Sequence, residues 1–150
     1  MKLTLKEGTA VAHPVLSEEG IIRSRAGFLD REGKDLIEAV LIRGQSASAV
    51  ARFMGVSPRT VRARVVGLTR RMSSRSFMEA ATALPHLDPD DRAIALAFFC
   101  QGVSQRELCR RTGLTAYGAR RRLEQVSTRI AIIRAVRDST EGRPPWREEP

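Results

Sequence analysis

The chain has few aromatic residues, few cysteines and no long apolar run. It contains one tryptophan, one tyrosine, five phenylalanines and two cysteines among 150 residues. A membrane-spanning helix needs about twenty consecutive apolar residues, and no such run is present. The first residues also lack the apolar core of a secretory signal. The sequence therefore predicts a protein without membrane contact, and we expect it in the cytoplasm.

The two cysteines favour neither a disulfide nor a metal site. Cys100 and Cys109 fall on predicted helices, where a buried reduced cysteine behaves as a small hydrophobic residue. No C-x-x-C pair exists, and only His13 and His86 could assist in binding a metal. A disulfide or a metal site is the alternative interpretation. We expect no metal and no cofactor.

Positive charge, mostly from arginine, is what the sequence has in excess. Lysine and arginine number 26 against 17 acidic residues, which gives a formal net charge of +9. This balance favours a polyanionic partner, and the planar guanidinium group suits phosphates and guanine edges better than an ammonium does. A basic surface that only keeps the protein soluble is the alternative. The arginines cluster on particular predicted helices, which favours a nucleic acid as the partner over a merely soluble basic surface.

One pattern occurs twice, with an offset of 58 residues. Residues 44–72 align with residues 102–130 without a gap, and each copy is typical of a helix, a tight turn and a second helix. The matched pairs are Ser46 and Ser104, Val50 and Leu108, Ala51 and Cys109, Gly55 and Gly113, Val56 and Leu114, Ser57 and Thr115, Val65 and Leu123, and Met72 and Ile130.

The first helix of each copy has a clear start and a clear end. Ser46 and Ser104 are predicted N-caps. Ser104 and Glu107 form a capping box, in which hydroxyl and carboxylate both satisfy free backbone donors. Gly55 and Gly113 then supply the positive φ that ends the helix and turns the chain.

The second helix of each copy is the predicted recognition helix. Ser57 caps it in the first copy, with Pro58 at the first helical position, and Thr115 caps it in the second copy. Val61 and Ala119 should face inward and belong to the core. The sequence therefore predicts an all-α protein with two tandem helix-turn-helix units of three to four helices each.

The pattern divides the chain into five segments. Ser73 and Ser74 break the helix of the first copy, and residues 77–84 could form a further short helix before Pro85. The N-terminal arm could form a short strand or a dimerisation element. The predicted segments are an arm (1–33), a first helix-turn-helix unit (34–72), a linker (73–87), a second helix-turn-helix unit (88–137) and a disordered tail (138–150).

The first turns of a recognition helix enter the major groove, so outward side chains just after the turn read the bases. Arginine is the commonest reader of guanine, and each paired contact contributes about 1–3 kcal/mol of discrimination. The predicted base-reading residues are Ser57, Arg59, Thr60, Arg62 and Ala63 in the first copy, and Thr115, Tyr117, Gly118, Arg120 and Arg121 in the second.

Other residues are predicted to contact phosphates, which position a protein without reading sequence. For any single arginine, an exposed or salt-bridged side chain is the alternative. Gly118 stands where the first copy has Thr60, which suggests either a close approach of backbone to DNA or a degraded copy. The predicted phosphate contacts are Ser46, Arg64, Arg70, Arg71, Ser104, Arg106, Arg110 and Arg122.

The second copy resembles region 4 of the sigma-70 family, which reads the −35 promoter element. Leu84-Pro85, the run 102–108 and the run 120–123 carry the resemblance, and the runs 55–57 and 60–65 of the first copy look similar. The resemblance covers roughly residues 34–72 and 84–130. It implies a helix-turn-helix fold and promoter-like DNA as ligand, in a bacterial or phage-like setting. An aromatic-rich basic helix for melting the −10 element, as in a whole sigma factor, is missing.

The leading hypothesis is a sequence-specific double-stranded DNA-binding transcription regulator, associated with the nucleoid, in which both units read the major groove. One chain would then cover two successive groove faces as a covalent pseudo-dimer, and a homodimer would cover a longer site. The alternative is a sigma-like adaptor or activator, in which one unit binds DNA and the other docks on RNA polymerase.

An enzyme is the least favoured class. A small transposase or recombinase needs a carboxylate triad, or an activated serine or tyrosine, within a catalytic fold. The acidic residues here lie at predicted helix caps or near the C-terminal end, and Tyr117 lies in a predicted recognition helix. We therefore expect no catalytic activity.

Overall fold

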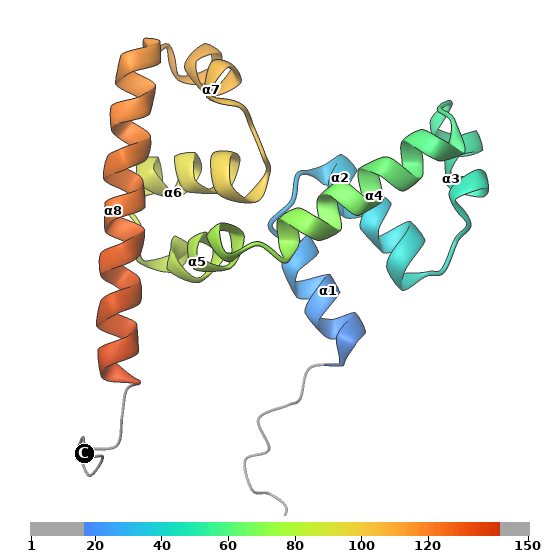
Figure 1. Ribbon diagram of the computed structural model, residues 1–150, viewed down its shortest axis with the longest axis horizontal. Coiled ribbons are helices and arrows are strands. Elements are labelled where there is room, and N and C mark those ends of the chain that lie inside the picture. Colours follow the sequence, from blue (N-terminus) through green and yellow to red (C-terminus); the bar gives the residue numbers. More distant parts are fainter. Residues whose placement is uncertain (1–16, 142–150) are drawn as a thin grey trace, which may run out of the picture.

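The computed structural model describes residues 17–141, and every regular element in that range is helical (Figure 1). The prediction of an all-α fold is confirmed. No helix in the described range is long and apolar enough to cross a membrane. The elements are α1 (Glu18–Ala26), α2 (Arg31–Ile37), the π-helical η2 (Glu38–Ile42), α3 (Ala47–Met54), α4 (Pro58–Met72), α5 (Arg75–Ala83), the 3₁₀-helical η3 (Leu84–His86), α6 (Pro89–Ala95), the π-helical η4 (Leu96–Cys100), α7 (Gln105–Thr112) and α8 (Ala116–Thr140).

The structural repeat extends before the aligned runs 44–72 and 102–130. Asp30 caps α2 by accepting the Gly33 N–H, and Asp88 caps α6 by accepting the Asp91 N–H. η2 and η4 then occupy matching positions at the same offset of 58 residues. A further helix precedes each copy, namely α1 and α5. We therefore define unit 1 as residues 17–72 and unit 2 as residues 74–141.

The two segments that were predicted to lie outside the units both contain helices in the described residues. The arm 1–33 contains α1, which Ser17 caps by accepting the Gly20 N–H, and also the start of α2. The linker 73–87 contains α5 and η3, so that only two residues separate α4 from α5. α8 extends to Thr140 into the segment that was predicted to be a tail. Residues 142–150 of that segment, and residues 1–16, lie outside the described residues.

The main hydrophobic core joins the two units. Its buried residues include Ala26 and Met72 of unit 1 together with Phe77 and Val126 of unit 2. At the junction, the rings of Phe28 and Phe77 meet edge to face, with their centroids 6.2 Å apart. A smaller second cluster lies under the helix-turn-helix of unit 1, and it consists of Leu36, Val50, Ala51 and Val61. The units therefore pack against each other rather than hanging on a linker.

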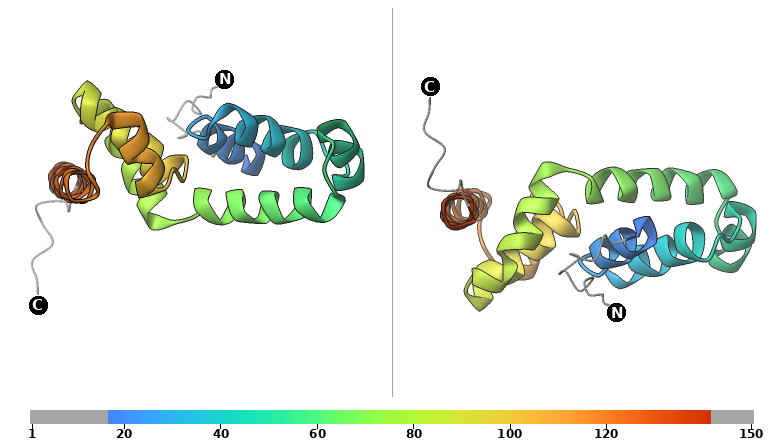
Figure 2. Two further views of the ribbon diagram at one scale, coloured as in Figure 1. Left: turned by 90° about the horizontal axis from the view of Figure 1, so that it is seen from above. Right: turned by 90° about the horizontal axis from the view of Figure 1, so that it is seen from below.

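The two predicted recognition helices, α4 and α8, do not run parallel to each other. α8 forms one side of the molecule, with α5, α6 and α7 against its inner face, while α4 runs across the other end (Figure 1). Seen from above or below, α8 is viewed along its axis and α4 lies in the plane of the picture (Figure 2). The repeat therefore places two similar surfaces in different orientations.

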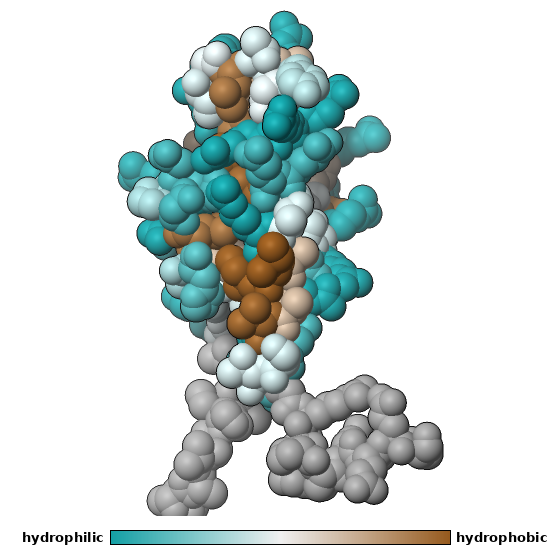
Figure 3. Space-filling view, turned by 90° about the vertical axis from the view of Figure 1, so that its left-hand side faces the viewer, coloured by the Kyte–Doolittle hydropathy of each residue, from teal (hydrophilic) through white to brown (hydrophobic). Residues whose placement is uncertain are grey.

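α8 also extends beyond the point at which the equivalent helix α4 ends. Ile130 matches Met72, the last residue of α4, and α8 continues from there to Thr140. Ile132 and Val136 on this extension are 57% and 59% exposed. Figure 3 shows the face that α8 forms, with an apolar patch in its lower part.

Candidate nucleic-acid interface

Both helix-turn-helix motifs have the predicted turn geometry. Gly55 and Gly113 end α3 and α7 in the left-handed conformation, with φ of 71° and 74°. Ser57 accepts the Thr60 N–H at 3.1 Å, and Thr115 accepts the Gly118 N–H at 3.0 Å. These two hydroxyl groups therefore fix the starts of the two predicted recognition helices. The same hydrogen bonds limit how freely the Ser57 and Thr115 side chains can turn towards a base.

α4 presents the base-reading candidates of unit 1. Arg59, Arg62 and Ala63 are exposed, and neither arginine forms an ion pair within residues 17–141. Thr60 is half-buried, and its hydroxyl lies 2.9 Å from the Ser57 hydroxyl. Val61 on the opposite face is fully buried, as predicted. Two arginines on the first turns of α4 are therefore available for a ligand.

α8 presents the corresponding candidates of unit 2. Tyr117 is 70% exposed, and Arg120 and Arg121 are exposed without an ion pair in the described part of the chain. Ala119 is fully buried, as predicted. Gly118 is half-buried, and a Cβ atom there would lie 3.1 Å from the Thr115 hydroxyl oxygen. The limited space beside the helix cap therefore explains the glycine at this position without invoking a contact with DNA.

Among the predicted phosphate contacts, Arg70 and Arg106 are exposed and form no ion pair within the described ranges. Arg64 and Arg110 form exposed ion pairs of 2.9 Å with Glu32 and Glu107. Exposed pairs of this kind contribute about 0–1 kcal/mol, so a phosphate can replace the carboxylate at little cost. These four arginines therefore remain candidates for phosphate binding.

The predicted capping box at the start of α7 is only half formed. The Ser104 hydroxyl accepts the Glu107 N–H at 3.1 Å, and the Ser46 hydroxyl caps α3 in the same way through the Ala49 N–H. The Glu107 carboxylate, however, accepts hydrogen bonds from Arg111 and Arg110 instead of from the backbone. Those hydrogen bonds lower the pKa of the Glu107 carboxyl group.

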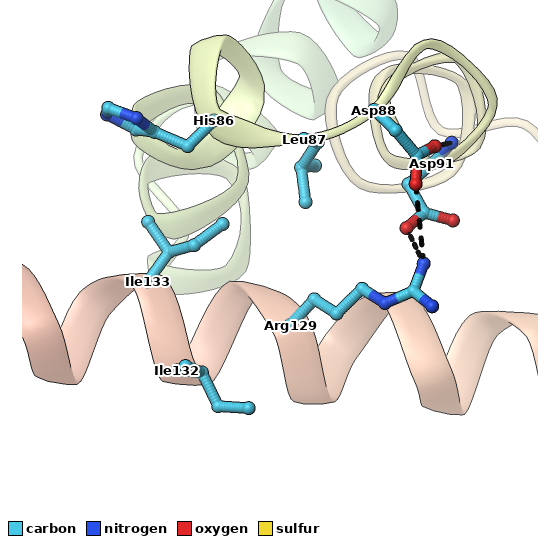
Figure 4. A pocket seen from close by; sticks show the side chains of 7 residues that line it. All are labelled: His86, Leu87, Asp88, Asp91, Arg129, Ile132 and Ile133. Carbon is cyan, nitrogen blue, oxygen red and sulfur yellow. Dashed lines mark hydrogen bonds and ion pairs between the residues drawn. The ribbon is translucent and has the colours of Figure 1, made fainter.

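Arg122 is not a free phosphate contact, which corrects the prediction. Its guanidinium group lies 2.9 Å from Oδ1 of Asp91, a fully buried carboxylate on α6, and the Arg122 side chain is only 32% exposed. Arg129 pairs with the other oxygen of Asp91 and also approaches Asp88 at 3.6 Å (Figure 4). The two arginines therefore join α8 to α6. Unit 1 has Gly33 in place of Asp91, so the repeat gave no signal for this site.

Arg71 is also engaged within the protein rather than directed at a ligand. Its Nη1 donates to the Gln101 carbonyl of unit 2 at 3.2 Å, and its guanidinium group lies directly against Gly102. Arg71 is only half-exposed. The prediction of a phosphate contact for Arg71 is therefore replaced by a contact between the units.

An apolar groove between α2, η2 and α3 was not predicted from the sequence. It has a volume of about 820 Å³, and Phe53 on its wall is 94% exposed. In unit 2 the positions of Phe53 and Ala49 are taken by Arg111 and Glu107, which form an ion pair. In the sequence, the signal for this groove was that Phe53 aligns with a charged residue, Arg111, in the second copy.

Both cysteines lie in unit 2. Cys100 is buried, and burial raises the pKa of its thiol to about 11. Cys109 is half-buried, and both cysteines are free. Within residues 17–141, no group of three His, Cys, Asp or Glu side chains is placed to hold a metal ion.

Comparison with known proteins identifies no relative. No protein-family description, no curated protein and no solved structure matches the chain.

Proposed function

We propose that this protein is a sequence-specific, double-stranded DNA-binding transcription regulator that reads the major groove with α4 and α8. One observation carries the proposal. Each unit ends a short helix at a left-handed glycine and presents, on the first turns of the next helix, two exposed arginines that form no ion pair within residues 17–141. Arg59 and Arg62 in unit 1 and Arg120 and Arg121 in unit 2 occupy the helix positions from which helix-turn-helix proteins contact base edges, and arginine is the commonest reader of guanine.

The charge of the molecule supports the same ligand. A net charge of +9 attracts a polyanion, and Arg70 and Arg106 add cationic side chains on α4 and α7. Contacts of this kind release counterions from DNA, so they contribute affinity that depends strongly on salt. A regulator with these properties would act on the nucleoid.

The relative orientation of the units restricts how DNA can be bound. Two groove faces one helical turn apart on a straight duplex are related by translation in a direct repeat and by a two-fold axis in an inverted repeat, so they need parallel or antiparallel recognition helices. α4 and α8 are neither parallel nor antiparallel (Figure 2). A site that engages both units at once therefore has its two elements in different orientations, or bends between them.

The proposal is tested by the fluorescence anisotropy of labelled duplex DNA at two salt concentrations. With about six phosphate contacts, affinity should fall roughly a thousandfold between about 50 and about 200 mM salt. Arg62→Ala should weaken binding, whereas Arg23→Ala removes the same charge from α1, where Arg23 pairs with Glu19, and should have little effect. Equal effects of the two substitutions, or no binding to duplex DNA, would reject the proposal.

A second candidate function is favoured by the groove of unit 1. In this alternative, unit 2 binds DNA and unit 1 docks on RNA polymerase as a sigma-like adaptor. An exposed phenylalanine beside an apolar groove is typical of a protein-binding surface, and unit 2 has no equivalent.

Phe53→Glu separates these two functions. The side chain is almost fully exposed, so the stability of the protein should change by less than about 0.5 kcal/mol. A polymerase adaptor would lose retention on immobilised RNA polymerase while keeping its affinity for duplex DNA. Equal retention of the wild type and the variant would exclude a role of this groove in polymerase binding.

A further inference from the structure

The junction between the units contains a contact that only glycine allows. Gly102 has φ of +69°, and a Cβ atom built on it would lie 2.3 Å from Cζ of Arg71. Gly44 is the equivalent residue of unit 1, with φ of +68°, and nothing lies within 4 Å of a Cβ atom there. Both glycines serve a left-handed turn. Only Gly102 also makes room for a guanidinium group from the other unit.

Arg71 is held in this position from several sides. Its Nη1 donates to the Gln101 carbonyl at the end of η4, and its own carbonyl accepts the Ser74 hydroxyl at 2.8 Å. The chain between α4 and α5 is only two residues long. Beside it, Phe28 and Phe77 are in edge-to-face contact across the same junction. The short connection, the hydrogen bond from Arg71 and the packing of the core therefore all restrict motion between the units.

We infer that Arg71 is a positioning residue that fixes the orientation of α4 relative to α8. One consequence rests on the proposed function: the DNA target is then a composite site of two sequence elements. Their separation and relative rotation are then set by the protein. A flexible pair of units would accept many spacings, because the second binding step would depend only on the reach of the connection.

The orientation is measured without DNA, by residual dipolar couplings of the free, isotopically labelled protein in a weakly aligning medium. In the wild type, one alignment tensor should fit the amide couplings of both units. In Arg71→Ala, and independently in Gly102→Ala, the tensors fitted to the two units should differ in magnitude.

Two variants provide matched controls. Arg70→Ala removes the neighbouring charge, and Gly44→Ala strains the equivalent turn, so both should keep a single tensor. Different tensors for the two units of the wild type would overturn the inference, and so would a single unchanged tensor in Arg71→Ala and Gly102→Ala.

The consequence for DNA is tested with duplexes that carry both selected elements at different spacings. The wild-type affinity should vary at least about tenfold with spacing, and Arg71→Ala should reduce this variation to less than about threefold. A flat spacing profile of the wild type would contradict the fixed arrangement. Absence of any DNA binding would instead refute the proposed function, and the dipolar couplings would still decide whether Arg71 fixes the orientation.

Discussion

The two units have the same order of helices but use equivalent arginines differently. In unit 2, Arg122 and Arg129 both pair with the buried Asp91. In unit 1 the equivalent arginines are Arg64, which pairs with Glu32 on the surface, and Arg71, which crosses to unit 2. The difference follows from one position, because unit 1 has Gly33 where unit 2 has Asp91.

Close packing explains why unit 1 has glycine at that position. A Cβ atom on Gly33 would lie 2.8 Å from Oδ1 of Asp30 and 3.3 Å from a methyl carbon of Leu68. A side chain there would require the side chains of Asp30 and Leu68 to shift. One small residue thus closes the interior of unit 1 and leaves Arg71 free to join the units.

The largest expected effect comes from removing the carboxylate that distinguishes unit 2. Asp91→Ala leaves Arg122 and Arg129 without their partner, and it should lower the free energy of unfolding by about 2–4 kcal/mol. The expected loss is smaller than the largest losses seen when a buried ion pair is broken, because the two arginines are partly exposed and can reach water. Urea unfolding followed by circular dichroism measures the difference.

Glu32→Ala is the matched control in unit 1. It breaks an exposed pair, which contributes about 0–1 kcal/mol. Similar losses for Asp91→Ala and Glu32→Ala would show that the buried cluster of unit 2 has no special role in stability.

The next effect concerns the two recognition helices. Arg62→Ala and Arg120→Ala should each cost about 1–3 kcal/mol of binding free energy on the preferred duplex, because each removes a side chain that we propose to read guanine. Titration of labelled duplexes, each with one altered base pair, measures the loss of discrimination. If Arg62→Ala keeps full discrimination while Arg120→Ala loses it, unit 1 does not read DNA and the adaptor function is favoured.

The smallest effect comes from the extension of α8, which unit 1 lacks. Glu79 on α5 accepts hydrogen bonds from Arg75 and, at 2.7 Å, from Arg134 on the extension. The hydrogen bond from Arg75, together with the charge of Arg134, lowers the pKa of the Glu79 carboxyl group. Glu79→Gln should therefore lower the free energy of unfolding at neutral pH by about 0.2–1 kcal/mol.

The pH dependence gives this small effect a distinct signature. A carboxyl group whose pKa is lowered by folding contributes stability above its unfolded pKa, ordinarily 4.5, and loses that contribution as the pH falls. The wild type and Glu79→Gln should therefore converge in urea unfolding as the pH falls from 4.5 through the lowered pKa of Glu79. A difference that stays constant with pH would mean that the carboxylate charge is not the cause.

Local features of the fold could be predicted from the sequence. Gly55 and Gly113 mark the turns, and Ser57 and Thr115 cap the next helices, because these residues act on their own backbone neighbours. The 58-residue offset then supported each assignment with a second copy. α1 was missed because Gly20 interrupts its pattern, and its packing against η2 is a tertiary contact.

The roles of individual arginines could not be predicted in the same way. Arg122 and Arg71 have the composition and spacing of phosphate contacts, but their partners Asp91 and Gln101 lie about thirty residues away in the sequence. Only the packing of α6 and η4 brings these partners within reach. Exposure can be inferred from a helical pattern, whereas the choice between an internal and an external partner requires the fold.

The most direct test of the central claim is selection of bound duplexes from a randomised library. It compares the wild type with the double variants Arg59→Ala/Arg62→Ala and Arg120→Ala/Arg121→Ala at one salt concentration. If both units read DNA, the wild type should enrich a site with two elements, and each double variant should lose a different one. Enrichment of the same site by all three proteins, or of no site by the wild type, would contradict the claim that α4 and α8 read the major groove.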